Sequence, residues 1–225
     1  MMKLSSLKGA VRGKPSSSRP EENGLDFEPG KLGTVRSYSS GSELLQQDTP
    51  ADAVYFIREG FVKLVWRESK GKESIVGLRG RGWFLGAASV ITSSLCPVSA
   101  IVLTRSIIER IPAEDFVDRV RGDPELTWKL HQIQSQELCE QFSWLGELAC
   151  CSARIRLMNL LIRLTASHDK NSENRNRRLR LPLKRTDIAE LIAVTPEHLS
   201  RLLRQLSREG QLDLSNGWIV VSETQ

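Results

Sequence analysis

The sequence has no long hydrophobic run. Its uninterrupted apolar stretches are only a few residues long, whereas a membrane-spanning helix needs about 20. This excludes an integral membrane protein, and we expect no membrane partner. No short apolar segment follows the lysines near the N-terminus, so we also expect no secretory signal. The sequence therefore predicts a cytoplasmic protein.

Cysteine and histidine are scarce. Four cysteines in 225 residues, two of them adjacent at Cys150 and Cys151, do not make the disulfide framework of a secreted domain. The three histidines are too scattered for a catalytic or metal cluster, and residues 31–112 contain none. A metal-dependent cupin-like enzyme would need a His/Glu ligand cluster in that stretch. We therefore expect no metal, no cofactor and no enzymatic activity.

Acidic residues are missing from residues 1–20, which carry five basic residues and a net charge of +5. Residues 21–151 hold 14 basic and 19 acidic residues, a net charge of −5, and residues 152–225 hold 13 and 8, a net charge of +5. An acidic middle followed by a basic C-terminal part indicates a sensing or assembly module joined to a module that binds a polyanion.

Residues 1–30 are rich in Ser, Gly, Pro, Lys and Arg and show no hydrophobic periodicity. This composition predicts a disordered basic tail. Three roles stay open for it: none beyond solubility, a weak contact with DNA or a membrane surface, or an organelle transit peptide.

Residues 31–122 show the pattern of an antiparallel β-roll. Short β-branched and aromatic runs alternate with turn signals such as Arg58-Glu59-Gly60 and residues 69–72. Short strands at regular spacing with glycine turns are typical of a small barrel or jelly roll. The predicted strands lie at 54–57, 61–66, 74–78, around 83–85, and twice between 99 and 111.

A long helix is predicted within residues 123–151. Asp123 is placed to cap it and Pro124 suits its first position. No further proline interrupts the chain to about Cys150, which gives ~26 helical residues and ~39 Å. An apolar stripe at i+3/i+4 spacing is formed by Leu130, Gln134, Leu138, Phe142, Leu145 and Ala149. We interpret this segment as a dimerisation helix and hinge; a core helix of a monomer is the alternative.

Residues 152–225 are predicted to form a helical module that ends in a hairpin. An amphipathic helix over 154–167 is followed by a polar linker over 168–178. The apolar face of that helix is expected to hold Ile155, Met158, Leu161 and Ile162. At the end of the chain, the strand-like runs 212–214 and 218–221 flank Asn216-Gly217, which is a strong hairpin signal.

Between the linker and the hairpin, residues 186–206 carry two short helices joined by a turn. Thr186 is expected to cap the first helix and Thr195 the second, with Pro196 at its first position and Ala193-Val194 in the turn. Their apolar faces are Ile188, Leu191 and Ile192, then Leu199, Leu202, Leu203 and Leu206. Two helices joined in this way, followed by a hairpin, predict a winged helix-turn-helix.

The outward face of the second helix carries side chains that read base edges. Arg201 can donate two hydrogen bonds to guanine, Glu197 can accept one from cytosine, and Ser200 can do either. Arg204 and Arg208 lie further along and are better placed for phosphates. The full set predicted to contact double-stranded DNA is Glu197, Ser200, Arg201, His198, Thr195, Arg204, Arg208 and Arg185.

The order of a β-roll, one long helix and a C-terminal winged helix-turn-helix resembles the cyclic-AMP receptor protein/fumarate–nitrate regulator family of bacterial transcription factors. The resemblance covers about residues 31–223, and its most specific parts are the sequences of residues 55–62 and 194–203. It implies a homodimer that binds a palindromic DNA site and contacts RNA polymerase. It also implies an effector that binds in the roll and changes the orientation of the two DNA-binding domains, the reading heads. Half-sites should lie about 10 bp apart, centre to centre.

Glu197, Ser200 and Arg201 form the E-x-x-S-R pattern that looks like the fumarate–nitrate branch, which reads TTGAT-like half-sites. The cyclic-AMP branch has an additional arginine immediately before the glutamate, where this chain has Pro196. The resemblance therefore favours TTGAT-like over TGTGA-type half-sites.

The effector-binding signature of the family is missing. Cyclic-nucleotide members use a Gly-Glu-Leu and an Arg-Ser-Ala segment, and the matching stretches here are 86–88 (Gly-Ala-Ala) and 98–100 (Val-Ser-Ala). A buried phosphate without a cation is costly, so we expect no dependence on cyclic AMP. No basic residue lies between Gly86 and Thr104, which also weighs against a dicarboxylate. The predicted pocket comprises Gly86, Ala87, Val98, Ser99, Cys139 and Glu140, and its effector is unknown.

The cysteines leave a second hypothesis for the function open. The first cysteine is Cys96, so the N-terminal cluster that oxygen-sensing relatives use for iron–sulfur is excluded. A redox switch remains an alternative, at Cys139 on the long helix or at Cys150-Cys151 in the hinge. Haem binding, with Cys96 or His131 as the ligand, is another. The alternative function is therefore a metabolite- or redox-responsive regulator of the same fold.

Overall fold

The structure, a computed structural model, describes residues 32–166, 176–179, 183–215 and 218–222. The predicted tail over 1–30, most of the predicted linker and the Asn216-Gly217 turn lie outside these residues. Within the described part of the chain, no helix is long and apolar enough to cross a membrane.

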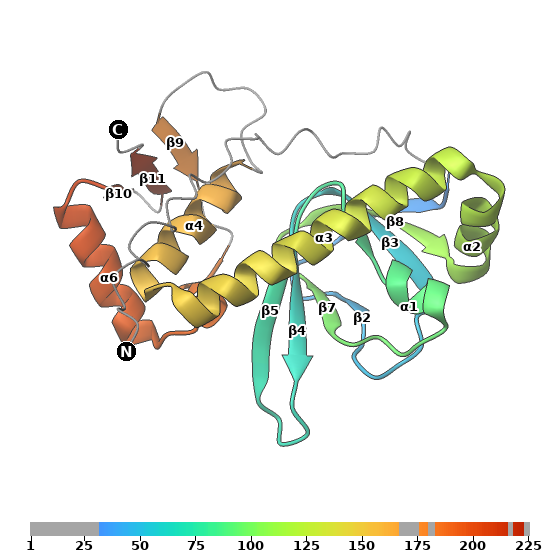
Figure 1. Cartoon of the computed structure of the whole chain (residues 1–225), viewed down its shortest axis with the longest axis horizontal. Helices are drawn as coiled ribbons and strands as arrows, with labels where there is room; N and C mark the ends of the chain where they lie inside the picture. The colour runs from blue at the N-terminus through green and yellow to red at the C-terminus, as the bar shows by residue number, and fades with distance from the viewer. Residues whose placement is uncertain (1–31, 167–175, 180–182, 216–217, 223–225) are drawn as a thin grey trace, which may run out of the picture.

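The N-terminal domain is a roll of two four-stranded antiparallel sheets, in the orders β1-β8-β3-β6 and β2-β7-β4-β5 (Figure 1). Its strands are β1 (Thr34–Tyr38), β2 (Glu43–Leu45), β3 (Ala53–Glu59), β4 (Val62–Arg67), β5 (Glu73–Arg79), β6 (Phe84–Leu85), β7 (Ser99–Val102) and β8 (Ser106–Pro112). The predicted roll is confirmed. Periodicity missed β1 and β2 because four of the five β1 residues are exposed and β2 is only three residues long.

Gly60 lies at the link between β3 and β4, which belong to different sheets. Its φ of +93° suits glycine, and an added Cβ would lie 2.1 Å from the Ser106 hydroxyl. Gly71, at φ +84° in the turn between β4 and β5, has no atom within 4 Å of an added Cβ. The first link therefore needs both the backbone freedom and the small size of glycine.

Replacing Gly60 by alanine is expected to destabilise the protein more than replacing Gly71. Gly71→Ala adds only backbone strain, about 1–2 kcal/mol, whereas Gly60→Ala also overpacks a close contact and should cost about 1–3 kcal/mol more. Denaturant unfolding of both variants measures the difference. Equal losses would mean that Ser106 moves aside without cost.

Glu109 of β8 holds the first residues of the roll through hydrogen bonds. Its side chain is fully buried and accepts hydrogen bonds from the backbone N–H groups of Leu32 and Gly33, at 3.2 and 2.9 Å, and from the Arg58 guanidinium. A buried carboxylate is tolerated when it is paired and hydrogen-bonded in this way.

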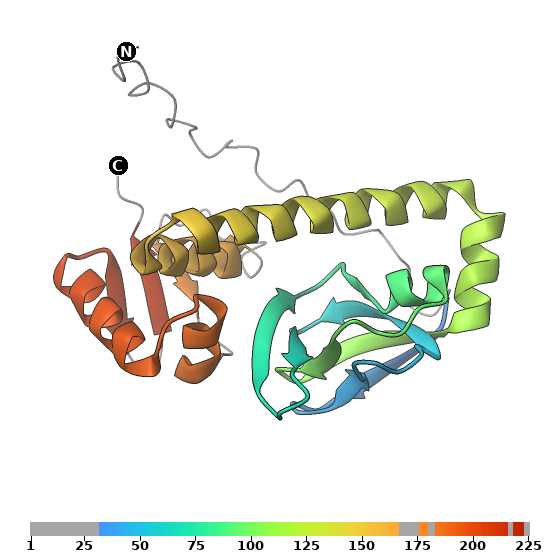
Figure 2. The ribbon, with the colours of Figure 1, turned by 60° about the horizontal axis from the view of Figure 1, so that its bottom comes forward.

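Three helices pack against the roll, the first between β6 and β7 and the other two after β8. They are α1 (Ala87–Thr92), α2 (Ala113–Gly122) and the long α3 (Pro124–Cys150), which runs past the roll to the C-terminal domain (Figures 1 and 2). The Asp123 carboxylate caps α3, accepting from the N–H groups of Glu125 and Leu126, both at 3.0 Å. Leu126, Leu130 and Ile133 are buried. The predicted start and end of this helix are confirmed, whereas α2 was not predicted.

The C-terminal domain contains α4 (Ala153–Ala166), α5 (Arg185–Leu191), α6 (Pro196–Arg208) and a three-stranded sheet ordered β10-β11-β9. Its strands are β9 (Asn176–Leu179), β10 (Leu212–Ser215) and β11 (Trp218–Ser222), and the predicted hairpin is β10–β11. The linker prediction was wrong over residues 176–178, because they pair with β11 and form an edge strand of the sheet.

The apolar face predicted for α4 was wrong at Ile155 and Ile162, which are exposed. Its buried face is shifted along the helix, so that the side chains inside the domain are Leu157, Leu160, Leu161 and Leu164. The buried face is shifted because α4 packs on α5 and α6. The sequence pattern does not distinguish the apolar residues that face these helices from those that face solvent.

Candidate nucleic-acid interface

The helix α6 begins as predicted. The Thr195 hydroxyl accepts a hydrogen bond from the backbone N–H of His198 at 3.2 Å, and Pro196 occupies the first turn. Its four leucines, Leu199, Leu202, Leu203 and Leu206, are all buried in the domain core. Because those leucines define the inner face, the opposite face of α6 is left to solvent.

The residues predicted to read bases lie on that outer face. Glu197 and Arg201 are exposed and Ser200 is half-buried, one helical turn apart along α6. Hydrogen bonds from the backbone N–H of Glu197 and from the Thr195 hydroxyl, together with the Arg201 charge, lower the pKa of the Glu197 carboxyl. This carboxylate is therefore ionised at neutral pH, and it can accept a hydrogen bond from a cytosine amino group.

The other predicted DNA contacts lie around the same helix. Arg204, Arg208 and Thr195 are exposed and His198 is half-buried. Arg185 is exposed in the first turn of α5. The structure thus brings seven of the eight predicted residues onto α6 or its cap, and the eighth onto the preceding helix.

The helix α5 is capped differently from the prediction. Its N-cap is Lys184, and Thr186 lies inside the first turn. The Asp187 carboxylate accepts from the Lys184 backbone N–H at 3.2 Å, which satisfies a group at the helix start. The buried apolar face of Ile188, Leu191 and Ile192 is confirmed. Ala193, with φ +51°, forms the turn into α6.

The helix pair is fixed to the end of α3 by side chains from both neighbouring helices. From α4, Arg156 donates to the carbonyl oxygens of Ile192 and Cys151, at 2.9 and 2.8 Å. From α3, the Trp144 indole N–H lies 3.4 Å from the carbonyl oxygen of Leu191. Glu147 of α3 also pairs with Arg163 of α4 at 2.8 Å. The reading helices are thereby held against the long helix.

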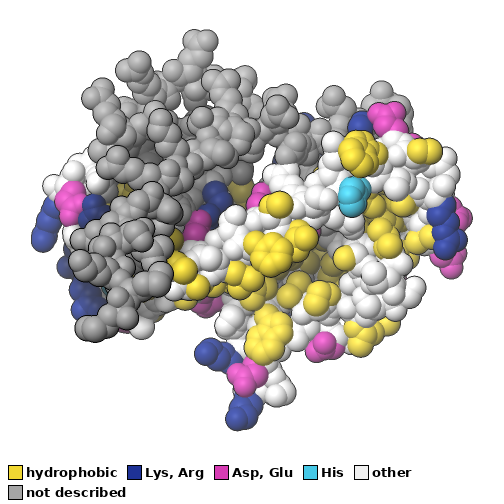
Figure 3. Space-filling view, in the orientation of Figure 1, with side chains coloured by type: hydrophobic (Ala, Val, Ile, Leu, Met, Phe, Trp, Pro, Cys, Tyr) yellow, Lys and Arg dark blue, Asp and Glu magenta, His cyan; other side chains and the backbone are white. Residues whose placement is uncertain are grey.

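One face of α3 carries large exposed hydrophobic side chains. Phe142 is 65% exposed, and Leu138 and Leu145, which lie on the same stripe, are more than half exposed. Figure 3 shows hydrophobic side chains gathering along this helix. Exposed apolar side chains grouped in this way are typical of interaction surfaces.

The predicted effector residues lie in two places. Ala87 and Ser99 are buried in the roll, and Gly86 and Val98 are half-buried there, whereas Cys139 and Glu140 are exposed on α3. No signal in the sequence indicated a cation beside Ser99. Arg67 of β4 donates to the Ser99 hydroxyl at 2.9 Å, and its charge is paired with Glu43 and Glu73 at 2.6 and 2.7 Å.

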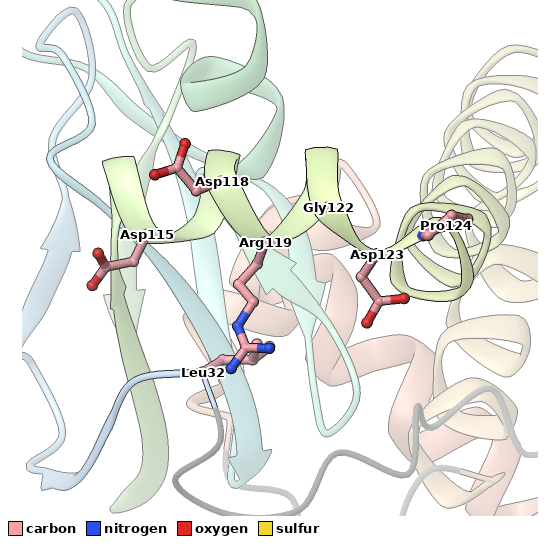
Figure 4. Close-up of a pocket in the computed structure, with 7 residues that line it drawn as sticks. All are labelled: Leu32, Asp115, Asp118, Arg119, Gly122, Asp123 and Pro124. Atoms are coloured by element: carbon pink, nitrogen blue, oxygen red, sulfur yellow. The ribbon is translucent and has the colours of Figure 1, made fainter.

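Two surface pockets of the N-terminal domain are lined by other residues. The first, of about 660 Å³, lies where α2 joins α3, between Asp115, Asp118 and Asp123 and the start of the roll at Leu32; the Arg119 side chain points toward Leu32 (Figure 4). The second, of about 590 Å³, lies between α1 and α2.

The cysteines differ in their surroundings. Cys96 is buried in the roll, and burial raises the pKa of its thiol, which disfavours the thiolate. Cys139 and Cys150 are exposed and Cys151 is half-buried. Within the part of the chain that the structure describes, no three His, Cys, Asp or Glu side chains are grouped to hold a metal ion.

Two family models match the chain. Residues 35–123 match the cyclic nucleotide-binding domain and residues 155–225 match the Crp-like helix-turn-helix domain. A "Probable transcriptional activator" of Rhizobium leguminosarum bv. viciae is 30% identical over 80% of this chain and 74% of its own length. The cAMP-activated global transcriptional regulator CRP of Salmonella typhimurium is 22% identical over 85% of this chain and 90% of its own length.

Solved structures show the same fold. FixK2 from Bradyrhizobium japonicum superposes with a TM-score of 0.73 at 22% identity, over 86% of this chain and 93% of that one. The regulator CLP of Xanthomonas campestris superposes with a TM-score of 0.70 at 21% identity, over 85% and 94%. With the roll, the long helix and the winged helix-turn-helix, these matches establish that the chain belongs to the CRP/FNR family of transcription factors.

Proposed function

We propose that this regulator is a homodimer that binds a palindrome of TTGAT-like half-sites and does not depend on cyclic AMP. The observation that carries the proposal is the outer face of α6, where Glu197 and Arg201 are exposed and Ser200 is half-buried between them. A guanidinium, a hydroxyl and an ionised carboxylate on one helical face supply the groups that read guanine and cytosine in the major groove.

The homodimer is supported by α3. Leu138, Phe142 and Leu145 form an exposed apolar row on a helix of 27 residues, and an identical helix of a second copy would cover it. A two-fold axis along α3 would present two α6 helices to successive major grooves, which is the arrangement that a palindrome requires.

Independence from cyclic AMP is supported by the surroundings of Ser99. The Arg67 guanidinium lies beside Ser99 and donates a hydrogen bond to its hydroxyl. The same guanidinium is already paired with the carboxylates of Glu43 and Glu73. A phosphate would have to displace Glu43 and Glu73 and would meet their negative charges. Their repulsion opposes the attraction to Arg67, so little net affinity for the phosphate is left.

The remaining parts of the proposal follow from the family. A regulator of transcription acts where its DNA and RNA polymerase are, so we place the protein in the cytoplasm and include RNA polymerase among its partners. We assign it no enzymatic activity. We divide it into a tail over 1–30, an effector-type roll over 31–122, a dimerisation helix and hinge over 123–151, and a DNA-binding domain over 152–225.

Fluorescence anisotropy without added effector, at ~150 mM salt, tests the proposal. The duplex TTGAT-N4-ATCAA is compared with a scrambled duplex of the same composition, because phosphate contacts contribute equally to both. We expect at least about a thousandfold tighter binding to the palindrome, unchanged when cyclic AMP is added. Equal binding to both duplexes would mean that the half-site is wrong or that an effector is required, and selection from a random library separates these two cases. Tighter binding on addition of cyclic AMP would contradict the proposed independence from it.

A further inference from the structure

The roll and the DNA-binding domain share one hydrophobic cluster. Phe61 and Ile75 of the roll are buried in the same cluster as the leucines of α4, α5 and α6. Leu78 and Leu103 pack against it from the roll side. The helix α5 lies beside β5 (Figure 2). The roll therefore touches the reading domain directly, as well as through α3.

An ion pair crosses this contact. The Lys63 ammonium of β4 lies 3.5 Å from Oδ1 of Asp187 in α5, and the two side chains are 24% and 10% exposed. The other oxygen of the same carboxylate accepts from the backbone N–H of Lys184 at the start of α5. One carboxylate thus connects the roll to the first turn of the helix-turn-helix.

Lys63 also lies on a strand that lines the interior of the roll. Its neighbours Val62 and Leu64 are buried in the core cluster of the roll, whereas the Lys63 side chain points to the other face of the sheet. A shift of β4 caused by a change inside the roll therefore moves the Lys63 ammonium and, with it, the contact to α5.

The reading face is open while this contact is made. Glu197, Arg201 and Arg204 are exposed in the same structure in which Lys63 meets Asp187. A contact that inhibited DNA binding by occlusion would cover these side chains. The pair is therefore compatible with a reading head that is ready for DNA.

We propose that Lys63 is a positioning residue: through Asp187 it fixes the orientation of each reading head and so determines the half-site spacing that the dimer accepts. The inference rests on the proposed palindrome-binding dimer. Two α6 helices reach successive major grooves only when their separation matches one turn of DNA. Without this pair, the head is held only by the α3–α4 hinge and the shared hydrophobic cluster and would sample more orientations. A smaller fraction would then fit one spacing, and other spacings would be accepted more readily.

The test measures the affinity for TTGAT and ATCAA half-sites separated by four, five or six base pairs, and for a duplex with a single half-site. Lys63→Met keeps the apolar stem but removes the charge, and Lys63→Arg is the matched control that keeps it. For Lys63→Met we expect the preference for the four-base-pair spacer to fall about fivefold. The affinity for the single half-site should be unchanged, and Lys63→Arg should retain the wild-type preference.

A double-mutant cycle separates this role from a general loss of stability. Asp187→Asn keeps an oxygen that can accept from Lys184, so the start of α5 is preserved. If the two residues act as a pair, Asp187→Asn changes the spacing preference in the wild-type background but not in Lys63→Met. A Lys63→Met protein with the wild-type spacing preference would overturn the inference alone. A wild-type protein for which selection from a random library yields no palindromic site would overturn the proposed function and the inference with it.

Discussion

Arg201→Ala is expected to weaken binding to the specific palindrome by about 1–3 kcal/mol and to relax the choice of base at one position of the half-site. The reason is geometric, because the exposed guanidinium on the outer face of α6 can donate two parallel hydrogen bonds to one guanine. Alanine removes both bonds and leaves the guanine acceptors without partners inside the interface. Anisotropy on duplexes that vary each half-site position measures both effects.

Arg208→Ala is the matched control for this experiment, since it removes the same kind of side chain from the last turn of the same helix. Arg208 is exposed and better placed for a phosphate. Its loss should weaken all duplexes similarly and reduce the salt slope by about one unit. If Arg201→Ala kept the base preference of the wild type and lost only affinity, Arg201 would be a phosphate contact and the proposed base code would be wrong.

Phe142→Glu is expected to convert the dimer into a folded monomer. The side chain is 65% exposed on one chain, so its replacement leaves the core of the protomer intact. In the proposed dimer, the glutamate would be buried at the α3–α3 interface close to its symmetry mate, where an unpaired charge is strongly disfavoured. Because the two reading heads are then no longer linked, affinity for the palindrome should fall by about 100-fold or more.

Sedimentation equilibrium and anisotropy together test this expectation. Ile91→Glu on α1 is the matched control, because it also places a charge at an exposed apolar position, but outside α3. The control should remain dimeric and bind the palindrome as the wild type does. A Phe142→Glu protein that still sediments as a dimer would place the dimer interface on another surface.

Local signals in the sequence predicted the reading helix and the long helix well. Asp123 and Thr195 cap their helices as expected, and all four leucines of α6 are buried. A cap and its helix lie within a few residues of each other, so neighbouring residue types are enough to identify them. The β-roll was also predictable, because its strands are short, apolar and separated by glycine turns.

The sequence predicted the wrong residues where the outcome depended on tertiary packing. Thr186 and Lys184 both precede the apolar face of α5, but α5 begins at Arg185 with Lys184 as its N-cap. The Asp187 carboxylate, which accepts from the Lys184 N–H, is also placed by its contact with Lys63 of the roll. Ile155 and Ile162 are as apolar as their neighbours in α4, but they face away from α5 and α6. The sequence indicates that an apolar side chain favours burial. It does not indicate which neighbouring element will bury it.

The sequence by itself determined the family, the order of the domains and the residues on the outer face of α6. Only the tertiary structure brought Arg67 to Ser99, 32 residues away in the chain, and Lys63 to Asp187, 124 residues away. The physical reason is the distance along the chain. Caps, turns and helical faces depend on residues a few positions apart, whereas a contact between domains depends on how the sheets and helices pack against one another.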